Sequence, residues 1–175
     1  MRKRVFSTKN IALISLFTAA LSLCSLVTVP FTIPFTLQTF GVFLAVFSLG
    51  LKKGIISVIT YILLGCTGLP VFSSFQGGLQ AIFSLNGGFI IGFVAMSLCI
   101  GFLVKKLGSK RVNLILAGIS GLIVLYLCEF LWLIFVYSFE ATTALTFIIV
   151  YFPFDIIKLV LAVFLSEKIK KFIRG

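Results

Sequence analysis

The apolar positions of this chain fall into long runs that are separated by short polar, basic or glycine-rich segments. The runs predict helices over residues 11–29, 39–51, 54–66, 80–104, 112–137 and 153–171. A helix needs about 20 apolar residues to cross the hydrocarbon core of a bilayer, and shorter runs cross by using flanking residues. The pattern therefore predicts an all-α integral membrane protein with six transmembrane helices.

The apolar segment 142–152 precedes Pro153 and allows two interpretations. Proline lacks a backbone N–H and fits best in the first turn of a helix. We therefore predict that the last helix begins near Pro153, and that residues 142–152 lie along the outer face of the bundle as a cover. The alternative is one helix over residues 143–165 with a kink at Pro153.

Two loops between the predicted helices have an unusual composition. Residues 30–40 contain two prolines that break the helical pattern, yet the loop is too apolar to lie in water. We expect it to fold back over the bundle, either as a lid over a ligand or as a plug with no ligand beneath it. The glycine-rich loop 67–81 suits backbone that approaches a ligand or another segment closely.

Composition supports a membrane protein. Of the 175 residues, 61% are hydrophobic, whereas a soluble domain averages about 45–50% apolar residues. The mean hydropathy is +1.26. The length fits a single membrane domain over residues 1–175 and leaves no room for a second. We expect no cleavable signal peptide, because the first apolar run is long and lacks a clear small-residue cleavage site.

The net charge of +11 is distributed as in a multi-pass membrane protein rather than a nucleic-acid-binding one. Fourteen of the fifteen Lys and Arg residues lie at the two chain ends, at 52–53 and at 105–111. The intervening loops near 30–40, 67–81 and 138–142 contain none. Because cytoplasmic loops carry the excess of Lys and Arg, this alternation predicts a cell-membrane protein with both termini in the cytoplasm.

The chain lacks the residue patterns of common catalytic and metal sites. It has no histidine, and its cysteines are scattered through apolar stretches, where we expect them to be small buried hydrophobes: Cys24, Cys66, Cys99 and Cys128. We therefore expect no metal site. A GxxxxGK[ST] phosphate loop, a GxSxG elbow and an HExxH pair are also missing, so we expect no enzyme, no ATP hydrolysis and no cofactor.

Asp155 and Lys158 are an acid and a base close together inside an apolar segment. A charge inside a bilayer costs about 2.5–3.5 kcal/mol on insertion scales, so it needs a partner or a task. Their spacing of three places both side chains on one face of a helix, with Asp155 in the first turn, where the helix dipole stabilises an anion. The two residues form either a structural ion pair or a ligand site.

Other polar side chains are candidates for the same site. Gln38 offers a donor and an acceptor, and Asn86, inside the predicted helix 80–104, requires a neighbour or a ligand. Phe72 and nearby apolar residues could form walls. Glu129, near the middle of a predicted helix, pairs with Lys158, lines the cavity or stays neutral, and the sequence leaves these alternatives open.

Small residues mark two faces where helices approach closely. One stripe runs along the first predicted helix, at Ala12, Ser15, Ala19 and Ser22. It packs either against helices of this chain or against a partner membrane subunit. Gly88 and Gly92 form a GxxxG pattern, which indicates a close helix crossing.

In three stretches the chain resembles the biotin-binding membrane subunits of energy-coupling-factor (ECF) vitamin transporters, the BioY family. The stretches are Pro34-Phe-Thr-Leu-Gln-Thr39, Gly68-Leu-Pro-Val-Phe72 with Gly77-Gly78, and Pro153-Phe-Asp155-Ile-Ile-Lys158. The resemblance implies the ECF S-component fold and high-affinity binding of extracellular biotin. It also implies import together with one transmembrane coupling subunit and two ATPase subunits.

The resemblance also implies which residues bind biotin, a ureido bicycle with a valerate carboxylate. The expected substrate-binding set is Gln38, Thr39, Phe72, Asn86, Glu129, Asp155 and Lys158. Asp155 is expected to accept the ureido N–H groups, and Lys158 to pair with the carboxylate or with Asp155. On the first helix, Ser15 and Ala19 match the small-xxx-small pattern by which S-components dock to the coupling subunit.

Three alternatives stay open at this point. One is an S-component of the same shape for another vitamin. Another is a non-transport membrane scaffold in which the Asp155–Lys158 pair is structural. The third is a proton-coupled carrier with Glu129 as the titrating group.

Overall fold

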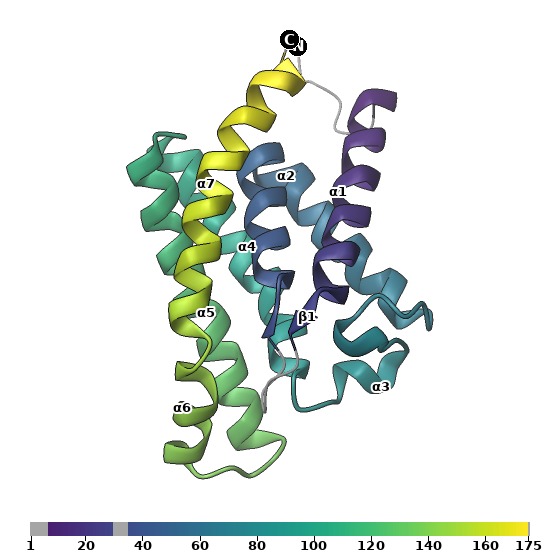
Figure 1. The fold of residues 1–175 in the computed structure, drawn as a ribbon, viewed down its shortest axis with the longest axis vertical. Helices are drawn as coiled ribbons and strands as arrows, with labels where there is room; N and C mark the ends of the chain where they lie inside the picture. Colours follow the sequence, from purple (N-terminus) through teal and green to yellow (C-terminus); the bar gives the residue numbers. More distant parts are fainter. Residues whose placement is uncertain (1–6, 30–34, 175) are drawn as a thin grey trace.

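The computed structural model describes residues 7–29 and 35–174, and most of this part of the chain is helical (Figure 1). The elements in chain order are α1 (Thr8–Leu26), β1 (Thr28–Val29), β2 (Phe35–Thr36), α2 (Gln38–Cys66), the 3-10 turn η1 (Ser73–Phe75), α3 (Leu79–Ile82), α4 (Gly87–Leu107), α5 (Arg111–Phe135), α6 (Ala141–Ile149) and α7 (Phe152–Arg174). The two short strands pair antiparallel, with Thr28 opposite Thr36. The predicted all-helical class is confirmed.

Helix length and hydropathy agree with a multi-pass membrane protein. Among the described residues, α1, α2, α4 and α5 are each long and apolar enough to cross a bilayer. The pair α6 and α7 meets the same test as one span that is bent by 40°. α7 begins at Phe152, which agrees with a helix start near Pro153, and the preceding segment forms the separate helix α6.

α2 consists of two helical arms that meet at Gly50. The φ angle of Gly50 is 77°, a left-handed conformation that costs glycine little. A Cβ atom added to Gly54 would lie only 2.7 Å from the Cα atom of Val46. The second arm therefore folds back against the first. The two helices that the sequence predicts at 39–51 and 54–66 correspond to these arms.

α4 is shorter at its N-terminal end than the predicted helix 80–104. The chain forms α3 and a turn first, and Asn86 lies immediately before the first residue of α4. Two carbonyl groups in this turn accept side-chain hydrogen bonds: Trp132 Nε1 donates to the Ser84 carbonyl oxygen at 3.1 Å, and the Tyr137 hydroxyl donates to the Phe83 carbonyl oxygen at 2.7 Å. The prediction that Asn86 lies inside a helix is therefore wrong.

The main core lies between α2, α4, α5 and α7. Phe43 and Phe47 stack on the first arm of α2, with ring centroids 5.6 Å apart. α4 and α5 pack closely at the glycines of α4, because a Cβ atom added to Gly88 would lie 2.8 Å from the Cα atom of Glu129. The close crossing that the GxxxG pattern predicts is confirmed.

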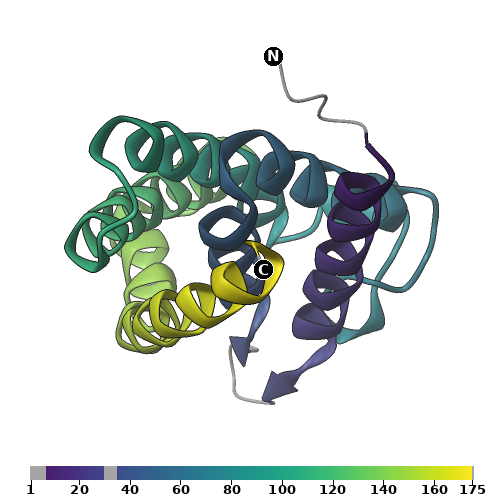
Figure 2. The same cartoon turned by 90° about the horizontal axis from the view of Figure 1, so that it is seen from above.

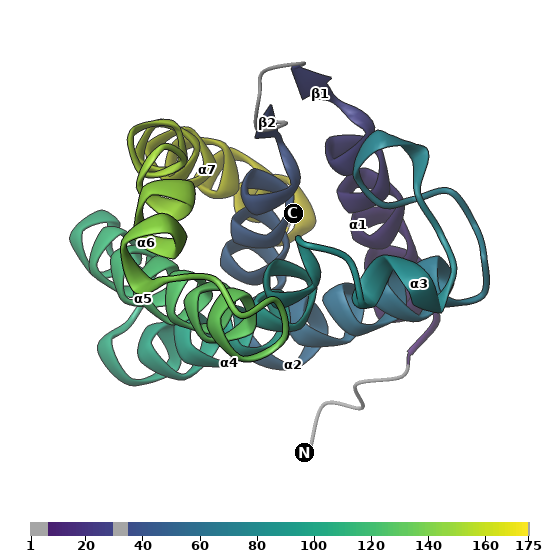
Figure 3. The ribbon, with the colours of Figure 1, turned by 90° about the horizontal axis from the view of Figure 1, so that it is seen from below.

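Both described chain ends lie at the same end of the bundle (Figures 1 and 2). There Lys9 Nζ donates to the Ile173 carbonyl oxygen at 3.1 Å, which joins the start of α1 to the end of α7. Arg111 and Glu167 form an ion pair of 2.8 Å between α5 and α7. Figure 3 shows the opposite end, where the strands, α3 and α6 lie.

Candidate functional site

A cavity lies where the first turns of α2, α4 and α7 come together. It encloses about 600 Å³ of space, including its open mouth. Its lining comes from four stretches of the chain: Thr36, Gln38, Thr39, Phe72, Ser73, Gln76, Ser84, Asn86, Phe89, Ile90, Phe93, Tyr151, Asp155 and Lys158. Three helix N-termini at one cavity favour a ligand with negative charge or carbonyl groups.

Asp155 and Lys158 form a buried ion pair in the wall of this cavity. The two residues are 2% and 4% exposed. Lys158 Nζ donates to Asp155 Oδ1 at 2.8 Å, and the Tyr126 hydroxyl donates to Asp155 Oδ2 at 2.7 Å. Both carboxylate oxygens are thus held in place by protein donors. The predicted placement of Asp155 and Lys158 on one helix face is confirmed, and of the open alternatives the structure contains the ion pair between them.

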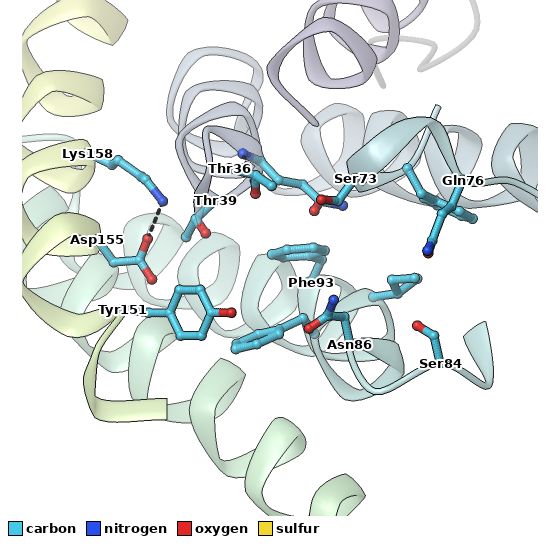
Figure 4. A pocket seen from close by; sticks show the side chains of 14 residues that line it. Thr36, Thr39, Ser73, Gln76, Ser84, Asn86, Phe93, Tyr151, Asp155 and Lys158 are labelled. Carbon is cyan, nitrogen blue, oxygen red and sulfur yellow. Dashed lines mark hydrogen bonds and ion pairs between the residues drawn. The ribbon is translucent and has the colours of Figure 1, made fainter. Parts of the chain in front are cut away.

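The cavity has a charged end and a neutral polar end. Figure 4 shows Asp155 and Lys158 at one end and Ser84 and Gln76 at the other, with Asn86 and Phe93 between them. A ligand that lies along the cavity therefore meets an ion pair at one end and hydroxyl or amide groups at the other.

Gln38 and Phe72 both line the cavity, and both side chains contact Tyr61. Gln38 Nε2 donates to the Tyr61 hydroxyl at 2.7 Å. The Tyr61 and Phe72 rings meet edge to face, with centroids 5.5 Å apart. Thr39, one residue after Gln38, is also buried in the wall. These contacts hold the start of α2 and the glycine-rich loop in fixed positions around the cavity.

Aromatic rings form much of the remaining wall. Phe89 and Tyr151 meet edge to face with centroids 5.4 Å apart, which joins the first turn of α4 to the residue before α7. Phe93 follows Phe89 one helical turn later and lines the same cavity. This wall suits the apolar part of a small ligand.

Glu129 lies outside the described cavity lining. It is fully buried on α5 against the first turn of α4, where a Cβ atom on Gly88 would lie 2.6 Å from Glu129 Oε2. Among the described residues, neither carboxylate oxygen has a hydrogen-bond partner. Lys158 bonds to Asp155 instead, so the alternative in which Glu129 pairs with Lys158 is not what the structure contains.

Sequence reasoning missed several residues of the cavity lining and one neighbour of the ion pair. Those in the cavity lining are Thr36, Ser73, Gln76, Ser84, Phe89, Ile90, Phe93 and Tyr151. Tyr151 lies two residues before Pro153, so its closeness in sequence to Asp155 could have marked it as a candidate. Tyr126, the donor to Asp155 Oδ2, lies 29 positions away, and no local pattern marks it.

Residues 30–40 and 142–152 are the two segments that we predicted to cover the bundle. Of the first loop, residues 30–34 lie outside the described part of the chain, and Thr36 lines the cavity. The segment 142–152 is not a cover over the cavity, because α6 packs on α5 through Ala144 and Ile148 against Leu133. Within this segment only Tyr151 belongs to the described lining.

Two other predictions concern the helix surface and metal ligands. Ser15 and Ala19 are both exposed on α1, while Ile14 and Phe17 are buried. The described residues contain no cluster of His, Cys, Asp and Glu that could hold a metal ion. The four cysteines are free and half-buried, which corrects the expectation that they are buried.

Comparisons with known proteins agree with one another. A family model described as the BioY family matches residues 1–175. The chain is 37% identical over 158 residues to the biotin transporter BioY of Thermotoga maritima, covering 89% of this chain and 92% of the relative. It is 36% identical over 166 residues to a probable biotin transporter BioY of Pyrococcus horikoshii, covering 93% and 96%.

One solved structure, the S-component for biotin from an ECF-type ABC transporter, has the same fold. The TM-score is 0.85 at 27% sequence identity, and the match covers 96% of this chain and 95% of the other.

Proposed function

Since this chain belongs to the BioY family, we propose that it is the biotin-binding S-component of an ECF-type transporter and imports extracellular biotin. One structural observation carries the assignment of the site. The buried Asp155–Lys158 pair lines a cavity instead of being closed off within the core. A merely structural ion pair would not require an adjacent cavity, so this observation disfavours the scaffold alternative.

The charged end of the cavity matches the polar groups of biotin. A carboxylate has about four lone-pair sites, so Asp155 can accept ureido N–H groups in addition to its bonds from Tyr126 and Lys158. Lys158 pairs with the valerate carboxylate or remains with Asp155.

The neutral groups of the site fit the rest of the ligand. Gln38 and Asn86 supply amide contacts, Thr39 a hydroxyl group, and Phe72 part of the apolar wall. Glu129 lies behind α4 and, in this proposal, has no direct contact with biotin.

The orientation in the membrane follows from charge and shape. The two arms of α2 count as two crossings, which together with α1, α4, α5 and the α6–α7 pair makes the six predicted transmembrane helices. The basic segments lie toward the end of the bundle that holds the described chain ends. We place that end in the cytoplasm by the positive-inside rule, so the cavity faces the outside of the cell membrane.

Import requires partners that hydrolyse ATP. In this proposal the chain associates with one ECF transmembrane coupling subunit and two ATPase subunits, and the chain itself is not an enzyme. The exposed pair Ser15 and Ala19 on α1 supports this association, because small side chains allow a partner helix to approach closely.

The first test is biotin binding to the purified, detergent-solubilised chain, beside Asp155→Ala and Lys158→Ala. We expect tight binding by the unchanged chain and a loss of at least about 100-fold in each variant, because each leaves a buried charge unpaired. Lys105→Ala, at the exposed end of α4, is the matched control and should bind normally. If the well-folded chain does not bind biotin, the biotin assignment is wrong. If it binds another vitamin instead, the chain is an S-component for that vitamin.

A double variant distinguishes loss of biotin binding from misfolding. The double change Asp155→Asn with Lys158→Met removes both charges together and keeps the approximate side-chain volume, so the fold should survive. If this folded variant still binds biotin as the unchanged chain does, the ion pair is structural and the proposed site is wrong.

A further inference from the structure

Tyr151 differs from the other three tyrosines of the chain in the state of its hydroxyl group. The hydroxyls of Tyr61, Tyr126 and Tyr137 form hydrogen bonds with protein groups. No described residue forms a hydrogen bond with the Tyr151 hydroxyl, although Tyr151 is half-buried and lines the cavity described above. A ligand that covers this hydroxyl binds more tightly if it also bonds to it, because an unpaired buried hydroxyl costs free energy.

The contacts of Tyr151 fix its ring before a ligand binds. Its backbone N–H donates to the Ile148 carbonyl oxygen at 3.0 Å, and its carbonyl oxygen accepts from the Asp155 backbone N–H at 3.0 Å. The ring meets Phe89 edge to face, with centroids 5.4 Å apart, and lies tilted against Phe147 at 6.3 Å. Contacts from α4 and α6 thus orient a residue at the start of α7, so the hydroxyl has a preset position.

The Tyr151 hydroxyl points into the cavity. Figure 4 shows it directed away from the α7 backbone, on the side that faces Asn86. Tyr151 and Asp155 are four positions apart, so their side chains lie on the same side of the first turn of α7. A ligand group that is bound at Asp155 is therefore close to Tyr151.

The donors around Asp155 differ in what they already bond to. Lys158 and Tyr126 each donate to one oxygen of the Asp155 carboxylate. The ureido group of biotin carries its carbonyl oxygen between two N–H groups. If Asp155 accepts an N–H, a hydrogen-bond donor is needed beside it for that oxygen, and the Tyr151 hydroxyl can donate there.

We propose that the Tyr151 hydroxyl donates a hydrogen bond to the ureido oxygen of biotin, and that Tyr151 thereby determines specificity for ligands with a ureido group. This inference rests on the proposed function and adds a residue to the binding site. Asp155 and Tyr151 then form an acceptor and a donor, one helical turn apart, that match the two kinds of polar group on the ureido ring.

The specificity follows from what other ligands would leave unpaired. A ligand with the same acidic chain but an apolar ring would cover the Tyr151 hydroxyl and the Asp155 carboxylate without bonding to either. A site that hydrogen-bonds a polar group of its substrate discriminates strongly against analogues that lack this group.

The first experiment measures equilibrium binding of biotin to the unchanged chain, to Tyr151→Phe and to Tyr137→Phe. Phenylalanine keeps the ring and its contacts with Phe89 and Phe147, so the fold should be retained. We expect Tyr151→Phe to lose about tenfold in affinity. Tyr137→Phe is the matched control, because it removes a hydroxyl that bonds to Phe83 outside the cavity lining.

Two analogues of biotin identify the atom that the hydroxyl contacts. In thiobiotin, sulfur replaces the ureido oxygen and accepts hydrogen bonds only weakly, so Tyr151→Phe should change its affinity by less than about twofold. In biotinol, an alcohol replaces the carboxylate at the other end of the molecule. Its affinity should fall in Tyr151→Phe by the same factor as that of biotin.

Infrared spectroscopy gives a readout that does not depend on the affinity of an analogue. Biotin with an isotope label at the ureido carbonyl carbon is bound at saturation to each form of the chain. Loss of a hydrogen bond to the carbonyl oxygen strengthens the C=O bond, so its stretching band should move to higher frequency in Tyr151→Phe. The band should stay in place in Tyr137→Phe.

The outcomes separate this inference from the proposed function. If the unchanged chain binds biotin and Tyr151→Phe binds it equally well, with no shift of the carbonyl band, the inference is wrong while the proposed function stands. An equal loss for biotin and thiobiotin, or a loss that disappears with biotinol, would also overturn it, since the hydroxyl would then not bond to the ureido oxygen. If the folded, unchanged chain does not bind biotin, both are wrong.

Discussion

Both oxygens of the Asp155 carboxylate accept hydrogen bonds from protein groups on different helices. Lys158 bonds to it within α7, and Tyr126 reaches it from α5. Tyr126 is not part of the described cavity lining, so it positions Asp155 from behind. Glu129, one turn further along α5, is buried without such donors. Of these two buried acids, only Asp155 borders the described cavity.

Tyr126→Phe tests this positioning role. Removing the hydroxyl frees Asp155 Oδ2 to rotate away from its ligand-binding position, so we expect biotin affinity to fall by about tenfold. Equilibrium binding to the purified variant measures this, with Tyr137→Phe as control because that hydroxyl bonds only to Phe83 outside the cavity. A drop in melting temperature with unchanged affinity would assign Tyr126 a structural role only.

Glu129→Gln tests whether Glu129 contacts biotin. The amide has nearly the shape of the carboxylate and carries no charge, so burying it costs less free energy. We expect biotin affinity within about twofold of the unchanged chain, and equal or higher thermal stability. A large loss of biotin affinity in the folded variant would indicate that Glu129 contacts biotin.

Among the elements, α2 and α4 determine the shape of the site. α2 breaks at Gly50, so its first arm presents Gln38 and Thr39 to the cavity while the second arm packs beside it. α4 begins after a turn, which places Asn86 at its N-terminal end. Apolar periodicity marked both regions as helical and located the break in α2. It did not locate the start of α4, because the turn before α4 depends on hydrogen bonds from Trp132 and Tyr137, which are distant in sequence.

Gly88→Leu tests the close crossing of α4 and α5. A Cβ atom at this position would lie 2.5 Å from the Cβ atom of Trp132 and 2.8 Å from the Cα atom of Glu129, so the helices must separate. We expect destabilisation of about 1–3 kcal/mol, with a lower melting temperature in detergent. Ile91→Ala, on the exposed side of α4, should change it less. Equal melting temperatures for Gly88→Leu and the unchanged chain would contradict the observed packing.

As a whole, the molecule separates a binding cavity at one end from basic segments and chain ends at the other (Figure 1). α1 extends along this axis and exposes Ser15 and Ala19 on its surface. This arrangement allows ligand binding and partner docking to occur on different surfaces of one bundle.

Ser15→Leu with Ala19→Leu tests docking at the scale of the assembly. The larger side chains should hold a partner helix away, so biotin uptake by cells with an ECF module should fall by at least about tenfold. Biotin binding by the isolated chain should be unchanged. Leu116→Ala, exposed on α5 and away from α1, is the control. Undiminished uptake in the double variant would place the docking surface elsewhere.

The membrane class, the helical segments and the placement of Asp155 and Lys158 on one helix face could be predicted from the amino-acid sequence. These features depend on local hydrophobicity, charge and helical spacing, which neighbouring residues specify. Which distant side chains lie near this ion pair depends on how the helices pack and could not be predicted. Gln38, Phe72 and Asn86 do line the cavity, whereas Glu129 turns toward α4. The rotation of each helix about its axis decides where its side chains point. That rotation depends on packing against other helices, and no local sequence pattern specifies it.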